Sequence, residues 1–298
     1  MKYAVTGGAG YIGSHLAKAL LRDGHSVEVI DSLSAGSLSN LADINDKIAF
    51  HKTDIRNGSE LNKILSGKDG IFHHAALTSV ADSYENEQEY TDVNVGGTRN
   101  VFEAAAESGT KVVFASSAGV YGDTNVIPTP ESADLKPANP YGRTKLEAEI
   151  LAKKFESKTD IVGLRYYNVY GEHPENSSSG VISKFYQSVS SGKPPVIEGD
   201  GMQVRDFVFV NDVVRATILA MEKKTGTTFV NIGSGKATSI LDLANMFIRY
   251  SKKDLRPVFE GGPEGNVRAS QADISLARRL LGWAPEKKLV DWIEEIMS

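Results

Sequence analysis

Tyr141 and Lys145, one helical turn apart, are the residues of this sequence best suited to proton transfer. They follow Pro140 at the start of a stretch that continues through Leu146, Ile150 and Leu151, a pattern that favours a helix with both side chains on one face. A lysine cation beside a phenol favours the phenolate, so we expect a lowered Tyr141 pKa and a base able to take an alcohol proton. Tyr-x-x-x-Lys alone also arises by chance on surface helices.

Ser117 is the expected partner of this pair. It ends an apolar stretch, Lys111–Ser117, that reads as a strand, 24 positions before Tyr141 (141 − 117). Ligands bind at the carboxyl ends of parallel strands. There the Ser117 hydroxyl could bond a substrate hydroxyl and share its proton with Tyr141.

A glycine loop predicts a dinucleotide site near the N-terminus. Gly7, Gly10 and Gly13 lie between a strand, Lys2–Thr6, and a helix whose apolar residues recur every four positions. Glycines at this spacing allow a tight turn and close approach of the backbone to a pyrophosphate at the helix N-terminus. The spacing is G-x-x-G-x-x-G rather than G-x-G-x-x-G, so the triplet is weak on its own.

Asp31 strengthens the prediction and favours NAD over NADP. It ends the second expected strand, 18 positions after Gly13 (31 − 13). A carboxylate there accepts hydrogen bonds from a ribose 2′-hydroxyl and repels a 2′-phosphate. The other interpretation is a surface aspartate that caps a turn. Asp54 and Ile55, at the end of the third strand, could hold the adenine, although Asp54 could equally be a strand-ending aspartate.

The elements that must position these residues alternate between strands and helices. Buried strands are predicted at Lys2–Thr6, Ser26–Asp31, Ala49–Ile55, Gly70–Ala76 and Lys111–Ser117. One helix is expected to start near Ser59 and another to cover Asp92–Glu107. Repeated β-α units imply an α/β fold of the Rossmann type, a doubly wound parallel sheet with helices on both faces.

The pattern changes near residue 170. Residues 1–170 are expected to form the NAD-binding domain and residues 171–298 most of a smaller α/β substrate domain, because prolines and Gly/Ser clusters become frequent there. Segments near 206–235, with strands at Asp206–Val210 and Thr228–Ile232, are expected to return to the first domain.

Composition narrows the class of protein. The 298 residues include no cysteine and carry a net charge of −5. These values exclude disulfides and thiolate catalysis and give no sign of nucleic-acid binding. We find neither a signal peptide nor an apolar stretch long enough for a membrane span, so a cytoplasmic location is expected. No metal-ligand spacing surrounds His73 or His74, and no metal is expected.

Several further motifs, taken with those above, resemble the extended short-chain dehydrogenase/reductase family over nearly the whole chain. They are His74-Ala75-Ala76, Ser116-Ser117-Ala118-Gly119-Val120-Tyr121-Gly122, Arg165-Tyr166-Tyr167-Asn168-Val169-Tyr170-Gly171 and Gly199-Asp200-Gly201 followed by Arg205-Asp206. The chain is most similar to UDP-glucose and UDP-N-acetylglucosamine 4-epimerases.

This resemblance implies NAD as the cofactor and Ser117, Tyr141 and Lys145 as the catalytic residues. The implied NAD contacts are Gly7, Gly10, Tyr11, Ile12, Gly13, Asp31, Asp54, Ile55, Ala75, Ala76, Asn94, Tyr141, Lys145 and Tyr167. The resemblance also implies a homodimer that pairs helices near Asn94–Glu107 and Tyr141–Phe155.

The residues after Ser117 favour epimerisation over dehydration. Related dehydratases need an additional acid/base just after this serine, whereas here the positions hold Ala118 and Gly119, which cannot shuttle protons. In C4 epimerisation Tyr141 takes the O4 proton while the C4 hydride moves to NAD. The 4-keto sugar then rotates and receives the hydride on its other face.

The UDP-sugar contacts are also implied by resemblance. They are Thr78, Ser117, Asn168, Val181, Val196, Ile197, Arg205, Arg268 and Ser270. Arg205 and Asn168 would contact the diphosphate, and Val196 or Ile197 could pack on uracil. The alternative role for Arg205 is an ion pair at the domain interface, for instance with Asp206.

Two positions bear on substrate choice. Related enzymes carry Arg-x-Gly-Asp where this chain has Pro263-Glu264-Gly265-Asn266, so the usual phosphate-binding arginine is missing and Arg268 or Arg256 could replace it. Ser270 aligns with a size gate beside the sugar 2-position. Its small side chain predicts that UDP-GlcNAc and UDP-GalNAc are accepted, together with UDP-Glc and UDP-Gal.

Other functions stay open at this stage. Within the family, a UDP-glucuronate 4-epimerase or a nucleotide-sugar reductase would use the same residues, and a reductase would consume NAD(P)H. A non-catalytic NAD-binding regulator could also use this fold, but it need not keep Ser117, Tyr141 and Lys145 together.

Overall fold

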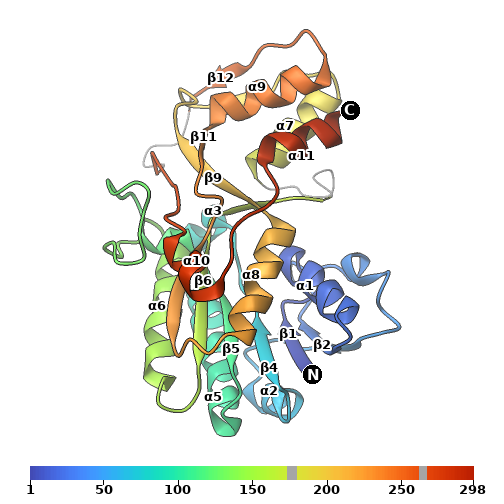
Figure 1. Cartoon of the computed structure of the whole chain (residues 1–298), viewed down its shortest axis with the longest axis vertical. Helices are drawn as coiled ribbons and strands as arrows, with labels where there is room; N and C mark the ends of the chain where they lie inside the picture. Colours follow the sequence, from blue (N-terminus) through green and yellow to red (C-terminus); the bar gives the residue numbers. More distant parts are fainter. Residues whose placement is uncertain (173–179, 262–266) are drawn as a thin grey trace.

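Parallel strands form the larger of two lobes in the computed structural model, which describes residues 1–172, 180–261 and 267–298 (Figure 1). Within these ranges, seven strands pair in the order β10-β6-β5-β4-β1-β2-β3, and every pairing is parallel. The strands are β1 (Lys2–Thr6), β2 (Ser26–Asp31), β3 (Ala49–Lys52), β4 (Gly70–His73), β5 (Val112–Ser117), β6 (Ile161–Tyr166) and β10 (Thr228–Ile232). The predicted doubly wound fold is confirmed.

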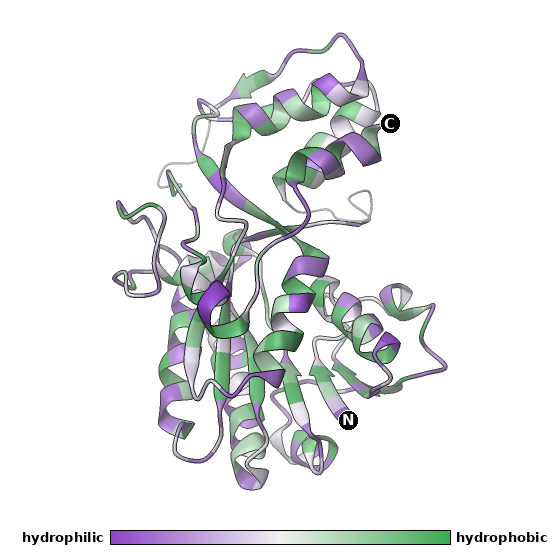
Figure 2. Cartoon of the chain, in the orientation of Figure 1, coloured by the Kyte–Doolittle hydropathy of each residue, from purple (hydrophilic) through white to green (hydrophobic). Residues whose placement is uncertain are grey.

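Alternating side chains along the strands bury both faces of this sheet. Phe72 and Val113 belong to one apolar cluster and Ile71 and Val112 to the other. Helices α1 (Tyr11–Arg22) and α8 (Val210–Glu222) cover the first face, and α2 (Gly58–Leu65), α5 (Thr98–Ser108) and α6 (Pro140–Phe155) cover the second. In Figure 2 the strands of this sheet are largely hydrophobic, whereas the helices carry mixed colouring, as expected of amphipathic helices.

The smaller lobe contains short sheets and three packed helices. One sheet holds β7 (Asn168–Tyr170), β9 (Val204–Phe209) and β11 (Ala237–Ser239), and another holds β8 (Val196–Glu198) and β12 (Val258–Glu260). Helices α7 (Val181–Ser190), α9 (Ile240–Ser251) and α11 (Leu289–Met297) pack around a third apolar cluster (Figure 1).

Two segments were expected to return to the larger lobe. Thr228–Ile232 forms β10 at the edge of the large sheet beside β6. Asp206–Val210 lies instead mostly in β9, paired with β7 and β11, and only the following helix α8 covers the large sheet.

Short elements complete the described chain. They are the 3₁₀ turns η1 (Leu38–Leu41) and η3 (Ala118–Val120), helices α3 (Val80–Glu85), α4 (Glu87–Thr91) and α10 (Ser275–Leu281), and the π-helical segment η2 (Asp92–Gly97). The helix expected over Asp92–Glu107 is therefore divided into η2 and α5. Asn57, not Ser59, caps α2, because its side chain accepts from the Glu60 N–H.

Candidate functional site

The glycine loop between β1 and α1 is packed too tightly for side chains. Gly7 has φ +68°, and a Cβ there would lie 2.5 Å from the backbone nitrogen of Ala75. A Cβ on Gly13 would lie 2.2 Å from the Gly7 carbonyl oxygen. The loop backbone therefore packs closely against the end of β4. The N-terminus of α1 stays open to an anion, as a pyrophosphate site requires.

Asp31 at the end of β2 holds the other side of the loop. Its carboxylate accepts hydrogen bonds from the backbone N–H groups of Ala9, at 2.9 Å, and Leu33, at 2.8 Å. Each oxygen keeps a free lone pair after these contacts. The residue can therefore bind a ribose hydroxyl while it fixes the loop.

A cavity of about 830 Å³ runs along the carboxyl ends of the central strands. Fifteen of the predicted site residues line it, namely Gly7, Gly10, Tyr11, Ile12, Gly13, Asp31, Asp54, Ile55, Ala75, Ala76, Thr78, Ser117, Tyr141, Lys145 and Tyr167. The glycine cradle and the acidic group on β2 fit a dinucleotide whose adenosine lies near Asp31 and whose nicotinamide lies near Tyr141.

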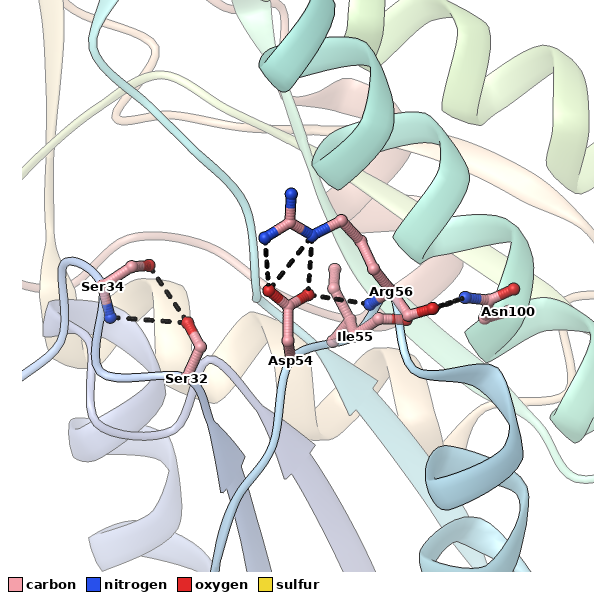
Figure 3. Close-up of polar contacts among 6 residues, drawn as sticks. All are labelled: Ser32, Ser34, Asp54, Ile55, Arg56 and Asn100. Atoms are coloured by element: carbon pink, nitrogen blue, oxygen red, sulfur yellow. Dashed lines mark hydrogen bonds and ion pairs between the residues drawn. The ribbon is translucent and has the colours of Figure 1, made fainter.

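The adenosine end contains polar groups that the sequence did not point to (Figure 3). The Arg56 guanidinium binds Asp54 with Nη2···Oδ2 at 2.6 Å, and its backbone N–H donates to Oδ1 at 2.8 Å. Asn100 donates to the backbone carbonyls of Ile55 and Arg56. The Asp54 carboxylate is thus held in place beside the cavity, and Arg56 also lines it. A charged residue two positions after Asp54 is the one sequence signal for this pair.

Asn94 does not line this cavity. Its side chain accepts from the Leu77 N–H at 2.8 Å and donates to the Leu77 carbonyl and to Thr144 Oγ1, each at 3.0 Å. It thereby fastens the segment after β4 to helix α6. These contacts define a positioning residue, and its direct contact with NAD stays a prediction.

Ser117, Tyr141 and Lys145 meet on the wall of the same cavity. Asn139 caps α6 by accepting from the Gly142 N–H at 2.8 Å, so Tyr141 lies in the first helical turn. Ser117 ends β5, and its oxygen accepts from the Gly119 N–H at 3.0 Å, which leaves its proton for another acceptor. Lys145 Nζ donates to the Ala115 carbonyl at 2.9 Å.

The Tyr141 pKa differs from the sequence expectation. Burial raises it, and the hydrogen bond with Ser117 lowers it only in part. The ammonium of Lys145 lies 5.8 Å from the centre of the Tyr141 ring, and burial lowers the Lys145 pKa to about 8. Without a bound ligand, desolvation thus favours the neutral form of both groups and outweighs the expected effect of the cation.

The turn after Ser117 carries no other acid or base and packs tightly against the start of α6. A Cβ on Gly119 would lie 3.2 Å from Ser117 Oγ, and one on Gly142 would lie 2.6 Å from the Gly119 carbonyl oxygen. The η3 turn and α6 therefore pack backbone against backbone. This packing keeps Ser117 beside Tyr141.

A buried ion pair lies behind the site. Arg165 on β6 and Glu149 on α6 pair through Nη2···Oε2 at 2.7 Å and Nε···Oε1 at 2.9 Å, and both side chains are almost fully buried. Ser116, next to Ser117, donates to Glu149 at 2.6 Å. The pair joins β5, β6 and α6 directly behind the catalytic residues.

The remaining predicted substrate residues lie outside this cavity, in or beside the smaller lobe. They are Asn168 on β7, Val181 at the start of α7, Val196 and Ile197 on β8, Arg205 on β9, and Arg268 and Ser270 in the segment beside β9. The Ser270 N–H donates to the Val204 carbonyl at 3.1 Å, which sets it next to Arg205.

Arg205 does not pair with Asp206. The Asp206 carboxylate accepts from Ser234, Gly235 and Ala272. Arg205 forms no ion pair with a residue in the described ranges and donates only to the carbonyl of Val204 at 2.9 Å. Burial lowers its pKa, although Asp123 opposes the shift. The guanidinium is thus available to an anion.

The two suggested uracil contacts differ in exposure, and both stay predictions. Ile197 is fully buried in the core of the smaller lobe, because alternate residues of β8 point to opposite sides, whereas Val196 is 41% exposed. Pro263 and Asn266, at the position of the missing arginine, lie outside the described residues. Arg268 forms an ion pair with Asp200 at 3.2 Å on the surface.

Sequence reasoning also missed further residues that line the cavity. They include Ser32, Ser34, Gly36, His74, Leu77, Glu89, Val93 and Tyr166. All except Glu89, Val93 and Tyr166 follow the carboxyl end of a strand, and this position was the available signal.

No described helix is long and apolar enough to cross a membrane. Within the described ranges, acidic and histidine side chains form no group suited to a metal ion.

A glycine-loop cavity that also holds Ser117, Tyr141 and Lys145 defines an NAD-dependent enzyme of the short-chain dehydrogenase class. The model of the NAD dependent epimerase/dehydratase family matches residues 3–233. The protein belongs to this family, and its cofactor is NAD.

Similar proteins agree on the type of reaction. The chain is 37% identical, over 99% of its length and 96% of the relative, to a putative UDP-glucose 4-epimerase of Methanocaldococcus jannaschii. A UDP-N-acetylglucosamine 4-epimerase of Methanobrevibacter ruminantium in complex with UDP-N-acetylmuramic acid superposes with a TM-score of 0.93 (35% identity, 99% and 96% of the two chains). A UDP-glucuronic acid 4-epimerase of Bacillus cereus in complex with UDP-glucuronic acid and NAD gives 0.90 (33%, 99% and 97%). These comparisons support NAD-dependent 4-epimerisation of a UDP-sugar.

Proposed function

We propose that this protein inverts C4 of UDP-GlcNAc and UDP-GalNAc, and also of UDP-Glc and UDP-Gal. The observation that carries the proposal is the meeting of Ser117, Tyr141 and Lys145 on the wall of the cavity that contains the glycine loop. The similar 4-epimerases support the reaction, and the small side chain of Ser270 supports the N-acetylated substrates.

Each residue of the site has its own proposed role. Gly7, Gly13 and Asp31 hold the NAD, which accepts a hydride from C4 and returns it when bound. In its phenolate form Tyr141 would take the proton of the sugar O4, and Ser117 would bond the same oxygen. Lys145 stays near the phenol because its ammonium is fixed to the Ala115 carbonyl.

The turn after Ser117 provides no further acid or base that could catalyse an elimination from the oxidised sugar. Ala118 and Gly119 occupy the turn where such an acid or base would be needed, and Gly119 packs closely against Ser117 and Gly142. Reaction therefore ends at the inverted alcohol, and NAD is restored in each turnover.

Arg205 is the proposed diphosphate contact. It is half-buried, has no ion pair with a described residue and lies beside Ser270 on the neighbouring segment. Charge-assisted hydrogen bonds to a phosphate are among the strong ones. A diphosphate on Arg205 would bring the attached sugar toward Ser270, where an N-acetyl group needs space.

The test is incubation of the pure protein with UDP-GlcNAc, UDP-Glc and UDP-glucuronate, separately and without added reductant, followed by separation of the 4-epimers. UDP-GalNAc and UDP-Gal are the expected products. UDP-Gal alone would overturn the N-acetyl specificity, and conversion of UDP-glucuronate alone would establish the alternative that the Bacillus cereus enzyme represents. Consumption of added NADH in step with product would identify a reductase instead.

Homodimer formation and a cytoplasmic location remain predictions. Helix α6 carries Ile150, which is 51% exposed in the single chain, as an interface on this helix would require. Light scattering of the purified protein measures the mass directly.

A further inference from the structure

His74 contains a buried polar atom that has no partner. The residue directly follows β4 and is one of those that line the dinucleotide cavity. Its Nδ1 is buried and makes no hydrogen bond within the described chain. Unpaired buried polar atoms are rare in folded proteins, because each loses its bonds to water without compensation, and one beside a ligand cavity suggests a ligand partner.

A chain of hydrogen bonds decides which nitrogen of this ring carries the proton. Thr217 Oγ1 donates to the Val213 carbonyl at 2.8 Å, so it can only accept from the Tyr166 hydroxyl, 2.7 Å away. The Tyr166 oxygen in turn accepts from His74 Nε2, at 3.2 Å. Nε2 therefore carries the hydrogen, and Nδ1 is left with a lone pair in the neutral ring.

The ring is also kept neutral. Burial lowers the His74 pKa to about 3, and the nearby charge of Lys145 contributes in the same direction. Protonation of Nδ1 from solvent is thus excluded at working pH. The atom is a hydrogen-bond acceptor that only an N–H or O–H group can satisfy.

The position of His74 limits what that group can be. His74 lines the cavity together with Tyr141 and Lys145, and its ring bonds Tyr166 on β6. Strands β4 and β6 lie on the other side of β1 from β2 and β3, which lead to Asp31 and Asp54, where the adenosine is expected. Resting on NAD as the cofactor, we propose that His74 Nδ1 accepts a hydrogen bond from the nicotinamide nucleoside half of NAD. Two donors of this half have the required chemistry, the carboxamide NH₂ and a ribose hydroxyl.

The contact requires a small movement, because Nδ1 has almost no exposed surface before the cofactor enters. Rotation about the Cβ–Cγ bond of histidine is soft, since its torsional wells are broad. His74 would then be a specificity-determining residue for the nicotinamide end, held in the correct tautomer by Tyr166 and Thr217.

The first test is cofactor affinity, measured by calorimetry on the nucleotide-free full chain. His74→Phe keeps a ring of similar shape but has no acceptor, and we expect NAD to bind about tenfold more weakly. His25→Phe is the matched control. It makes the same substitution at a histidine that packs on Tyr3 outside the cavity, so NAD affinity should change less than about threefold.

Two NAD analogues distinguish the donors. Nicotinic acid adenine dinucleotide lacks the carboxamide NH₂, and ADP-ribose lacks the nicotinamide but keeps the ribose hydroxyls. If the carboxamide is the donor, His74→Phe weakens NAD alone and removes the preference of the wild type for NAD over the acid analogue. If a ribose hydroxyl is the donor, all three ligands weaken together. Unchanged affinity for NAD in His74→Phe would overturn the proposal.

A second test needs no variant and so does not depend on the folding of His74→Phe. The ¹⁵N resonances of the histidine ring report directly on tautomer and hydrogen bonding. Without nucleotide, His74 should show an unprotonated Nδ1, and NAD should shift this resonance upfield. A protonated Nδ1, or a resonance unmoved by saturating NAD, would contradict the proposal. Loss of 4-epimerase activity is not part of either test, so the proposed reaction and this contact can fail separately.

Discussion

Lys145 Nζ lies 5.8 Å from the centre of the Tyr141 ring and 2.9 Å from the carbonyl oxygen of Ala115 on β5. The lysine therefore fastens the first turns of α6 to the strand that ends in Ser117. It also carries its charge in a buried place, since only 7% of its surface is exposed. The contact with Ala115 thus fixes the position of the lysine, and the burial of its charge lowers the stability of the fold. Both effects can be measured.

Tyr141→Phe removes the proposed base with little change in shape. Because the proton of O4 then has no acceptor in the site, we expect kcat to fall by about 10²- to 10⁴-fold while NAD still binds. Tyr84→Phe is a suitable control, as Tyr84 is 63% exposed and outside the cavity. Turnover of Tyr141→Phe within a few-fold of wild type would remove Tyr141 from the mechanism.

The buried Lys145 charge predicts a pH-dependent stability in the nucleotide-free protein. Burial lowers the Lys145 pKa from 10.5 to about 8, so the unfolded chain holds this proton more tightly than the folded one. The charge destabilises the folded state fully below pH 8, and the penalty is relieved as pH rises toward 10.5. Its size is on the order of 3 kcal/mol.

Urea unfolding of wild type and Lys145→Met at several pH values measures this effect. The free energy of unfolding of wild type should rise relative to that of the variant between pH 8 and 10.5. The same comparison with Lys154→Met, an exposed position on α6, should give no such trend. A constant difference between wild type and Lys145→Met would show that the lysine is not buried as a charge.

The buried pair Glu149–Arg165 predicts a strong coupling of two substitutions. Glu149→Leu leaves the Arg165 guanidinium buried without its carboxylate and should lower the free energy of unfolding by about 3–5 kcal/mol. Glu149→Leu combined with Arg165→Met removes both charges and should be less destabilised than Glu149→Leu alone. Additive losses in a double-mutant cycle would mean that the pair contributes no mutual stabilisation.

The sequence predicted the large sheet well because buried parallel strands and amphipathic helices leave periodic patterns. It placed two strand ends wrongly. The expected strands Ala49–Ile55 and Gly70–Ala76 run past the true ends at Lys52 and His73. These extra residues leave the sheet to line the cavity, and no local pattern separates the two situations.

Three-dimensional packing explains the other differences. The glycine loop, Ser117, Tyr141 and Lys145 could be placed from spacing, since they follow strands or share a helical turn. The burial of Ile197, the Tyr141 pKa and the tautomer of His74 depend on residues distant in the chain, such as Thr217, and no sequence pattern reports them.

Asp54 is expected to recognise the amino group of adenine. Its carboxylate is oriented by Arg56 at the adenosine end of the cavity (Figure 3). Asp54→Ala should weaken NAD about three- to tenfold but leave nicotinamide hypoxanthine dinucleotide, which lacks that amino group, nearly unchanged. Asp134→Ala removes a similar aspartate from an exposed ion pair and should affect neither ligand. Equal weakening of both dinucleotides by Asp54→Ala would assign the residue to loop structure instead.

Ser270→Tyr is the sharpest test of substrate choice. Ser270 is fixed by its backbone bond to Val204, beside the proposed diphosphate contact Arg205. A tyrosine ring there would fill the space that a 2-acetamido group needs, so kcat/KM for UDP-GlcNAc should fall about tenfold or more while that for UDP-Glc is largely kept. Ser270→Ala leaves the space open and should keep both activities. If Ser270→Tyr retained full activity on UDP-GlcNAc, the sugar 2-position would have to face another part of the protein, and the placement of the diphosphate on Arg205 would be wrong with it.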